Sequence, residues 1–302
     1  MPGLPDVGPG GSRFGAHVYL WATDASVPAL DRAIGEAARV GLDFVQLSLS
    51  SPSLDVGAVR ESLVRHGMSC LTGLAIPGSV WSDRRHGAVR RYLRWAVDAT
   101  AELGAGMLSG ALYTPMGERS EPRHRREELR LIGRELKQVA RYASDRGVRL
   151  GLEPLNRYET SLINTCEQMR EFLEELDEPN LAIQLDTFHM NIEEQDLHRA
   201  FVQANGRLGY VQLAESDRGI PGDGHVAWDA VFRGLRDVQY AGPLAFESFR
   251  IQNRVLAQAA CLWRDVVGDG TQFVLRGWRQ MSEAAARVGY ELPGHLVDEL
   301  SS

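Results

Sequence analysis

The chain has 302 residues, of which 44% are hydrophobic and 24% charged, as is typical of a globular protein with a large buried core. Its formal net charge of −7 argues against a nucleic acid or an anionic membrane as a standing partner, because both bind basic surfaces. We expect a cytoplasmic protein with reduced thiols, because no apolar run approaches the roughly 18 residues of a membrane span and three separated cysteines give no disulfide framework.

The first half of the chain alternates apolar segments of strand length with longer segments of helical periodicity. Residues 1–12 are rich in Gly and Pro and are predicted to be a flexible lead-in. In chain order, we then expect a strand at 14–21, a helix at 29–40, a strand at 44–49, a helix at 55–66, a strand at 68–74, a helix at 88–103 and a strand at 107–110. Gly41, Gly67 and Gly104 follow these helices, as is typical of helix C-caps.

The second half continues the same alternation. We expect a helix at 126–146, a strand at 149–153, a helix at 166–176, a strand at 181–186, a helix at 196–204, a strand at 208–214, a helix at 228–237 and a strand at 244–247. Residues 254–302 are predicted to form a closing helix and a helical tail from about residue 269. Eight strands with helices between them predict an α/β fold, a single (β/α)₈ TIM barrel over residues 13–302.

Four consecutive predicted strands carry, at or near their ends, side chains whose oxygen atoms can bind a metal ion: Glu153, Asp186, Gln212 and Glu247. The carboxyl ends of parallel strands meet on one face of a barrel, where active sites lie. A single carboxylate at a strand end is commonly just solvated, but three carboxylates and an amide on neighbouring strands favour a shared site. Such oxygen ligands suit one divalent ion, Mn²⁺ or Mg²⁺, with Co²⁺ as a further candidate.

A metal ion between two carboxylates suits proton abstraction beside a carbonyl group. The cation polarises the carbonyl oxygen and stabilises the enediolate that forms. If one glutamate removes a proton and the other returns it from the opposite face, the carbon centre inverts. This chemistry favours an enzyme that inverts a carbon centre beside a carbonyl group.

Several segments carry a family resemblance. They are GLEPLNRYETSLINT at 151–165, LDTFHMNIEE at 185–194, ESDRGIPGDGHVAW at 215–228 and FESF at 246–249, with a weaker LSGALYTPMG at 108–117. The chain resembles the ketose 3-epimerases (D-tagatose, D-allulose or D-psicose, and L-ribulose 3-epimerases) of the xylose isomerase-like TIM barrel superfamily over most of residues 13–268. The resemblance implies metal-dependent epimerisation at C3 of a free ketose, by an enzyme that forms a homodimer or homotetramer.

The resemblance also implies roles for individual residues. Glu153 and Glu247 would be metal ligands and the acid/base pair, and Asp186 would be a further ligand. Three residues would hold oxygens around the first three carbons of the substrate: Glu159, His189 and Arg218. Glu159 has the alternative role of orienting Glu153 through a hydrogen bond.

Two residues depart from the family pattern. Gln212 stands where the epimerases usually have a metal-binding His, six residues before the substrate Arg. The related hydroxypyruvate isomerases resemble this chain in having Gln there, and an amide oxygen in place of imidazole favours Mg²⁺ or Mn²⁺ over Co²⁺. Gln46 stands where the family often has Glu, which affects the choice of substrate more than the type of reaction.

Alternatives remain open at this point. Trp21 and Tyr113 are predicted as walls of the substrate pocket, with core packing as the equal alternative. Gln212 favours an aldose–ketose or hydroxypyruvate-type isomerase as the second function, and Gln46 leaves room for an epimerase of a sugar derivative. A barrel that binds sugar without converting it is the alternative outside enzymes.

Overall fold

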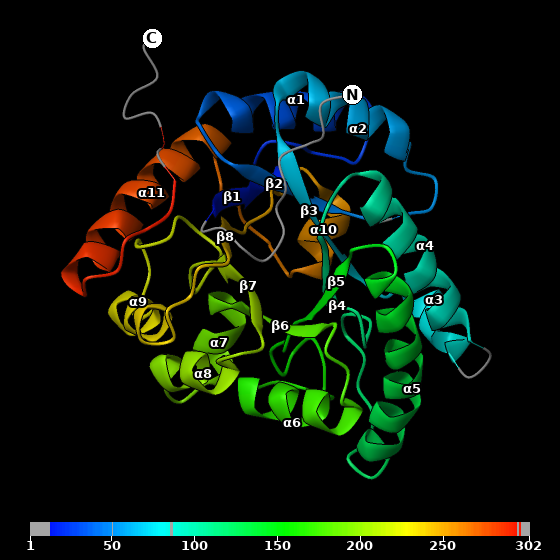
Figure 1. Cartoon of the computed structure of the whole chain (residues 1–302). Coiled ribbons are helices and arrows are strands. Elements are labelled where there is room, and N and C mark those ends of the chain that lie inside the picture. Colours follow the sequence, from blue (N-terminus) through cyan, green and yellow to red (C-terminus); the bar gives the residue numbers. More distant parts are fainter. Residues whose placement is uncertain (1–12, 50, 85–86, 295, 297–302) are drawn as a thin grey trace.

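The predicted TIM barrel is confirmed by the computed structural model, which describes residues 13–49, 51–84, 87–294 and 296. Eight parallel strands close into a barrel in the order β1 to β8, with β1 paired to both β2 and β8 (Figure 1). The strands are β1 (Arg13–His17), β2 (Phe44–Ser48), β3 (Ser69–Ala75), β4 (Met107–Ala111), β5 (Arg149–Leu152), β6 (Leu181–Asp186), β7 (Leu208–Leu213) and β8 (Pro243–Phe246). The predicted lead-in at 1–12 lies outside the described residues.

Helices surround the barrel (Figure 1). They are α1 (Val27–Arg39), α2 (Val56–His66), α3 (Gly78–Ser82), α4 (Ala88–Glu102), α5 (Arg125–Ser144), α6 (Cys166–Leu176), α7 (Thr187–Glu193), α8 (Leu197–Ala204), α9 (Trp228–Asp237), α10 (Arg254–Ala259) and α11 (Gly270–Arg287). The predicted helical tail corresponds to α11, whose Trp278 packs edge-on against Phe14 of β1 at 4.7 Å between ring centroids. Among the described helices, none is long and apolar enough to cross a membrane.

Local sequence signals set where the helices begin and end. Asp55 and Thr165 cap α2 and α6, each accepting a hydrogen bond from a backbone N–H of the first turn. Gly67 ends α2 in the left-handed conformation with φ of 65°, which glycine adopts without a steric penalty. A separate apolar cluster of the barrel contains one residue from each of six strands: Phe44, Leu71, Met107, Ala182, Tyr210 and Ala245.

Two elements differ from the sequence prediction at positions that matter for the site. The first strand ends at His17 instead of residue 21, because the His17 imidazole accepts from the Tyr19 backbone N–H and starts a 3₁₀ turn over Val18–Leu20. The second is the seven-residue helix α7, which follows β6 directly and was not predicted. Asp186 caps it through the Phe188 N–H at 2.9 Å, and it is too short for a periodic pattern to reveal.

Candidate active site

A cavity of about 380 Å³ lies where the barrel strands end. One wall is apolar and comes from the ends of β2 to β4 and from α10, with Leu49, Ile76 and Leu256 among its residues. The other wall is polar. Its side chains are His17, Gln46, Ser48, Glu153, Glu159, Gln184, His189, Gln212, Arg218 and Glu247.

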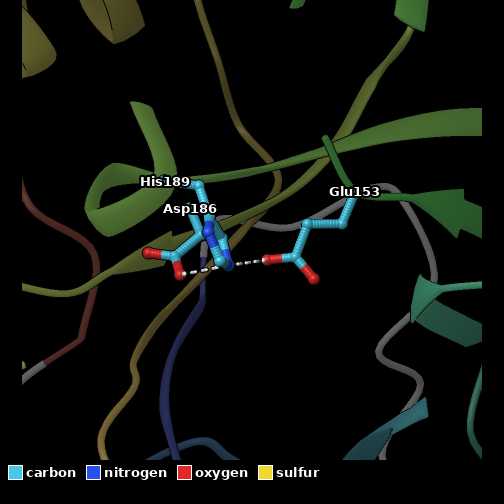
Figure 2. A group of neighbouring side chains, drawn as sticks. All are labelled: Glu153, Asp186 and His189. Atoms are coloured by element: carbon cyan, nitrogen blue, oxygen red, sulfur yellow. Dashed lines mark ion pairs between the residues drawn. The ribbon is translucent and has the colours of Figure 1, made fainter. Parts of the chain in front are cut away.

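Glu153, Asp186 and His189 form a compact group in this polar region (Figure 2). Glu153 directly follows β5, Asp186 is the last residue of β6, and His189 lies one helical turn further on α7. The His189 Nε2 atom is 3.8 Å from Glu153 Oε1 and 3.6 Å from Asp186 Oδ2. Across the described residues, this is the group of three whose potential ligand atoms all lie within 4.8 Å of one another, so the structure contains a possible metal site.

The charge balance of the group fits a cation. Burial raises the pKa of Glu153 and of Asp186 well above the usual range, and the charge of Glu247 raises both further. Glu247 lies on the same cavity, so three carboxylates share one buried guanidinium, that of Arg218. A divalent ion would supply the positive charge that this buried cluster lacks.

Arg218 links the carboxylates and remains charged. Its Nη1 atom donates to Glu247 Oε2 at 2.5 Å and lies 3.4 Å from Asp186 Oδ2. Burial alone lowers the pKa of Arg218, but Glu247 and Asp186 more than offset this and raise it. The guanidinium lies 4.0 Å from the Phe188 ring centroid, and its buried Nε atom has no partner within the described parts of the chain.

The hydrogen bonds of His189 make it a donor toward the cavity. The backbone N–H of Asn156 donates to His189 Nδ1 at 3.2 Å, so Nδ1 must carry the lone pair. Burial lowers the pKa of His189 well below its usual value, and the ring is neutral. The proton of a neutral ring then sits on Nε2, which faces Glu153 and Asp186. In this tautomer His189 serves as a hydrogen-bond donor, and it offers no lone pair to a metal on that side.

Buried amide side chains surround Gln212. Gln184 Nε2 donates to Gln212 Oε1 at 2.5 Å, and Gln212 Nε2 donates to Gln46 Oε1 at 2.8 Å and to Glu247 Oε1 at 2.6 Å. The Tyr210 hydroxyl donates to the same Gln46 oxygen at 2.7 Å. Gln212 thus lies beside Glu247, with its nitrogen toward that carboxylate and its oxygen occupied by Gln184.

The structure places two predicted wall residues away from this cavity. Tyr113 is fully buried, and the backbone oxygens of Glu153 and Ile163 each lie 3.0 Å from its hydroxyl and share its one hydrogen, so it supports the end of β5. Trp21 lines a separate cavity beside α1 and the start of α11, where its indole N–H donates to Thr271 at 3.0 Å. Tyr113 is therefore packed in the core, which was the alternative to its prediction as a pocket wall.

Sequence reasoning missed three polar residues of the cavity: His17, Ser48 and Gln184. Gln184 had a readable signal, because it precedes Asp186 by two residues and alternate residues of a strand share a face. Ser48 had the same relation to Gln46. No pattern in the sequence indicated that His17 lines the cavity, because its position depends on the turn that ends β1 early.

Comparison with known proteins identifies the family. The profile of the family described as "Xylose isomerase-like TIM barrel" matches residues 34–267. The L-ribulose 3-epimerase of Methylomonas sp. (strain DH-1) is 32% identical over 87% of this chain and 96% of that protein. The ketose 3-epimerase of Arthrobacter globiformis is 34% identical over 86% of this chain and 92% of that protein.

A solved structure agrees with these relatives. The crystal structure of the D-allulose 3-epimerase from Methylomonas sp. in complex with D-allulose matches at a TM-score of 0.83 and 32% identity, covering 90% of this chain and 99% of that chain. The similarity thus extends over the whole barrel and not over one motif. The chain belongs to the xylose isomerase-like TIM barrel family and, within it, to the ketose 3-epimerases.

Proposed function

We propose that this protein epimerises a free ketose at C3, with Glu153 and Glu247 as the two groups that move the proton. The observation that carries the proposal is the position of these carboxylates, which line one cavity from β5 and β8. Two strands lie between β5 and β8, so the side chains reach the cavity from different directions. The names of the curated relatives support the same reaction.

We assign one divalent cation to the carboxylates of Glu153, Asp186 and Glu247. When bound, such an ion polarises the ketose carbonyl and stabilises negative charge on its oxygen. Oxygen ligands favour Mg²⁺ or Mn²⁺. Gln212 joins this ligand set through its oxygen only if its amide turns, because Oε1 accepts from Gln184 in the structure.

The proton moves between carboxylates and C3. One glutamate removes the C3 proton from one face of the sugar, and the other delivers a proton to the opposite face, which inverts the centre. The Nε2–H of His189 and the free Nε–H of Arg218 donate to substrate oxygens near the reacting carbon. Glu159 accepts from a substrate hydroxyl through Oε2, which is buried without a partner among the described residues.

Product analysis with a panel of unmodified ketoses tests the proposal. The protein, loaded with Mg²⁺, Mn²⁺ or Co²⁺ in separate samples, is incubated with each sugar and the products are separated by chromatography. We expect the C3 epimer of at least one ketose. An aldose product would instead establish the isomerase favoured by the amide at Gln212, and turnover of a sugar derivative alone would replace the free ketose as substrate.

A further inference from the structure

Asn156 contacts two of the proposed substrate-binding residues and does not itself line the cavity. The residue is only 2% exposed, in the segment that follows β5. Its Nδ2 atom lies 2.9 Å from His189 Nδ1 and 3.0 Å from Glu159 Oε1. An amide nitrogen carries two hydrogens, so one is available for each partner.

The remaining polar atoms of Asn156 are also used. Its Oδ1 atom accepts from the Tyr158 backbone N–H at 2.9 Å, which closes a local turn and fixes the amide orientation. Its backbone N–H is the second donor to His189 Nδ1, at 3.2 Å. Two donors on one side of the His189 ring leave the ring proton on the other side, at Nε2.

The Asn156 amide also determines which oxygen of Glu159 is left without a partner. With Oε1 held by the Asn156 amide, Oε2 is left without a partner in the described parts of the chain. Glu159 and His189 both line the cavity. The two residues therefore present one acceptor and one donor, the pair of groups that recognises a hydroxyl, which both donates and accepts.

We propose that Asn156 is a positioning residue, which fixes His189 as a donor and Glu159 as an acceptor for hydroxyl groups of the substrate. The inference rests on the proposed function for its role in turnover. Its structural part, the tautomer of His189, is measurable without any sugar.

The test is Asn156→Asp, which is nearly isosteric. The new carboxylate keeps an oxygen for the Tyr158 N–H, so the turn is retained, but it replaces the donor with an acceptor beside His189 Nδ1 and Glu159. Protein labelled with ¹⁵N-histidine reports the tautomer by NMR, and the His189→Gln spectrum assigns the His189 signals among the eight histidines. In the wild type we expect a protonated Nε2 and an unprotonated Nδ1.

In Asn156→Asp the backbone N–H still donates to His189 Nδ1, but the carboxylate beside it favours a proton there, so we expect a measurable population of the Nδ1–H tautomer that the wild type lacks. We also expect kcat/KM to fall about 10- to 100-fold, the usual loss when a partner that orients a ligand-binding group is removed. An unchanged tautomer would overturn the proposal, and so would a changed tautomer with wild-type kcat/KM. If no ketose is turned over by the wild type while the tautomer still changes, the proposed function fails and the control of His189 by Asn156 stands.

Asn164→Asp is the matched control. Asn164 lies in the same segment and its Nδ2 atom donates to the backbone oxygens of Leu155 and Thr160 at 2.8 and 2.9 Å, without contact to His189. We expect a lower Tm with unchanged His189 signals. If Asn156→Asp does not fold, Asn156→Ala removes the amide donors without adding charge. Wild-type kcat/KM in that variant would overturn the proposal.

Discussion

Glu153 and Glu247 are the residues on which the proposed chemistry depends. We expect Glu153→Gln and Glu247→Gln each to lower kcat/KM by about 10²- to 10⁴-fold, the contribution of a positioned general acid or base. Glu153→Gln also removes one charge from a crowded, buried cluster, so the Tm of its metal-free form should equal or exceed that of the wild type. Steady-state kinetics and thermal unfolding measure both effects.

The exposed Glu167 of α6 provides the control for this pair. Glu167→Gln removes a carboxylate of the same type that does not line the cavity, and should leave kcat/KM and Tm near wild-type values. Near-native turnover in either Glu153→Gln or Glu247→Gln would contradict the two-glutamate mechanism.

We expect Gln212 to influence which ion the proposed site prefers. Competitive titration of the wild type should show Mg²⁺ or Mn²⁺ binding without a strong preference for Co²⁺, because every proposed ligand is an oxygen atom. Gln212→His introduces an imidazole beside Glu247 and should shift the preference toward Co²⁺ by roughly tenfold or more. A strong Co²⁺ preference in the wild type would count against this view of the site.

At the scale of elements, the segment between β7 and α9 holds Arg218 in place. Arg218 has a φ of 60°, unusual for a residue with a side chain, and its backbone oxygen accepts from the Ser248 hydroxyl at 2.6 Å. Gly222 has a φ of 101°, and a Cβ on Gly224 would lie 2.6 Å from Glu215 Oε1. The segment therefore wraps closely around the Glu215 carboxylate.

Glu215 is fully buried and accepts four hydrogen bonds, from the backbone of Ser216, Gly222 and Val226 and from the Trp228 indole, at 2.8 to 3.0 Å. Burial alone raises its pKa, but these hydrogen bonds outweigh burial and lower it. We expect Glu215→Gln to reduce the free energy of unfolding by about 2–4 kcal/mol at neutral pH, because an amide nitrogen must then face a donor.

The pH dependence of this loss has a defined sign. A lowered folded-state pKa stabilises the protein above the unfolded pKa of about 4.3, and the contribution disappears as pH falls through the folded value. The difference between wild type and Glu215→Gln should therefore shrink as pH falls below about 4. Asp217→Asn, at a side chain 48% exposed in the same segment, should cost less than about 1 kcal/mol. A constant difference at all pH values would contradict this role for Glu215.

The sequence predicted the bounds of helices and strands well where the apolar pattern was continuous over the whole element. The segments 166–176, 181–186 and 228–237 have the predicted bounds, because the apolar pattern runs through each whole element, and Thr165 also caps the first of them. The bounds of β1 and the existence of α7 depend on single hydrogen bonds of His17 and Asp186, which no periodicity reports.

The strand-end positions of Glu153, Asp186 and Glu247 were readable in the same way, because the barrel brings strand ends together. The orientation of the Gln212 side chain could not be predicted from the sequence. It is set by Gln46, which is 166 residues away in sequence and becomes a neighbour only when the barrel closes. The Asn156–His189 contact is likewise a product of tertiary structure, across 33 residues.

At the scale of the whole molecule, closure of the barrel joins the carboxylates of β5, β6 and β8 into one cluster with excess negative charge. Ion binding should therefore stabilise the fold. An ion present at 100 times its Kd adds about 2.7 kcal/mol, a rise in Tm of a few degrees. Thermal unfolding with EDTA and then with added Mn²⁺ measures this, and Asp186→Asn should reduce the response. An identical Tm in all samples would contradict the proposed ion site.

The central claim is that a proton at C3 of a ketose is exchanged between two glutamates, and its most direct test is turnover of D-allulose and L-ribulose in deuterated water, followed by NMR. We predict that the epimeric product carries deuterium at C3, and that Glu153→Gln and Glu247→Gln form this product about 10²- to 10⁴-fold more slowly. Deuterium at C1 or C2 together with an aldose would contradict the claim, as would an epimer that retains hydrogen at C3 throughout.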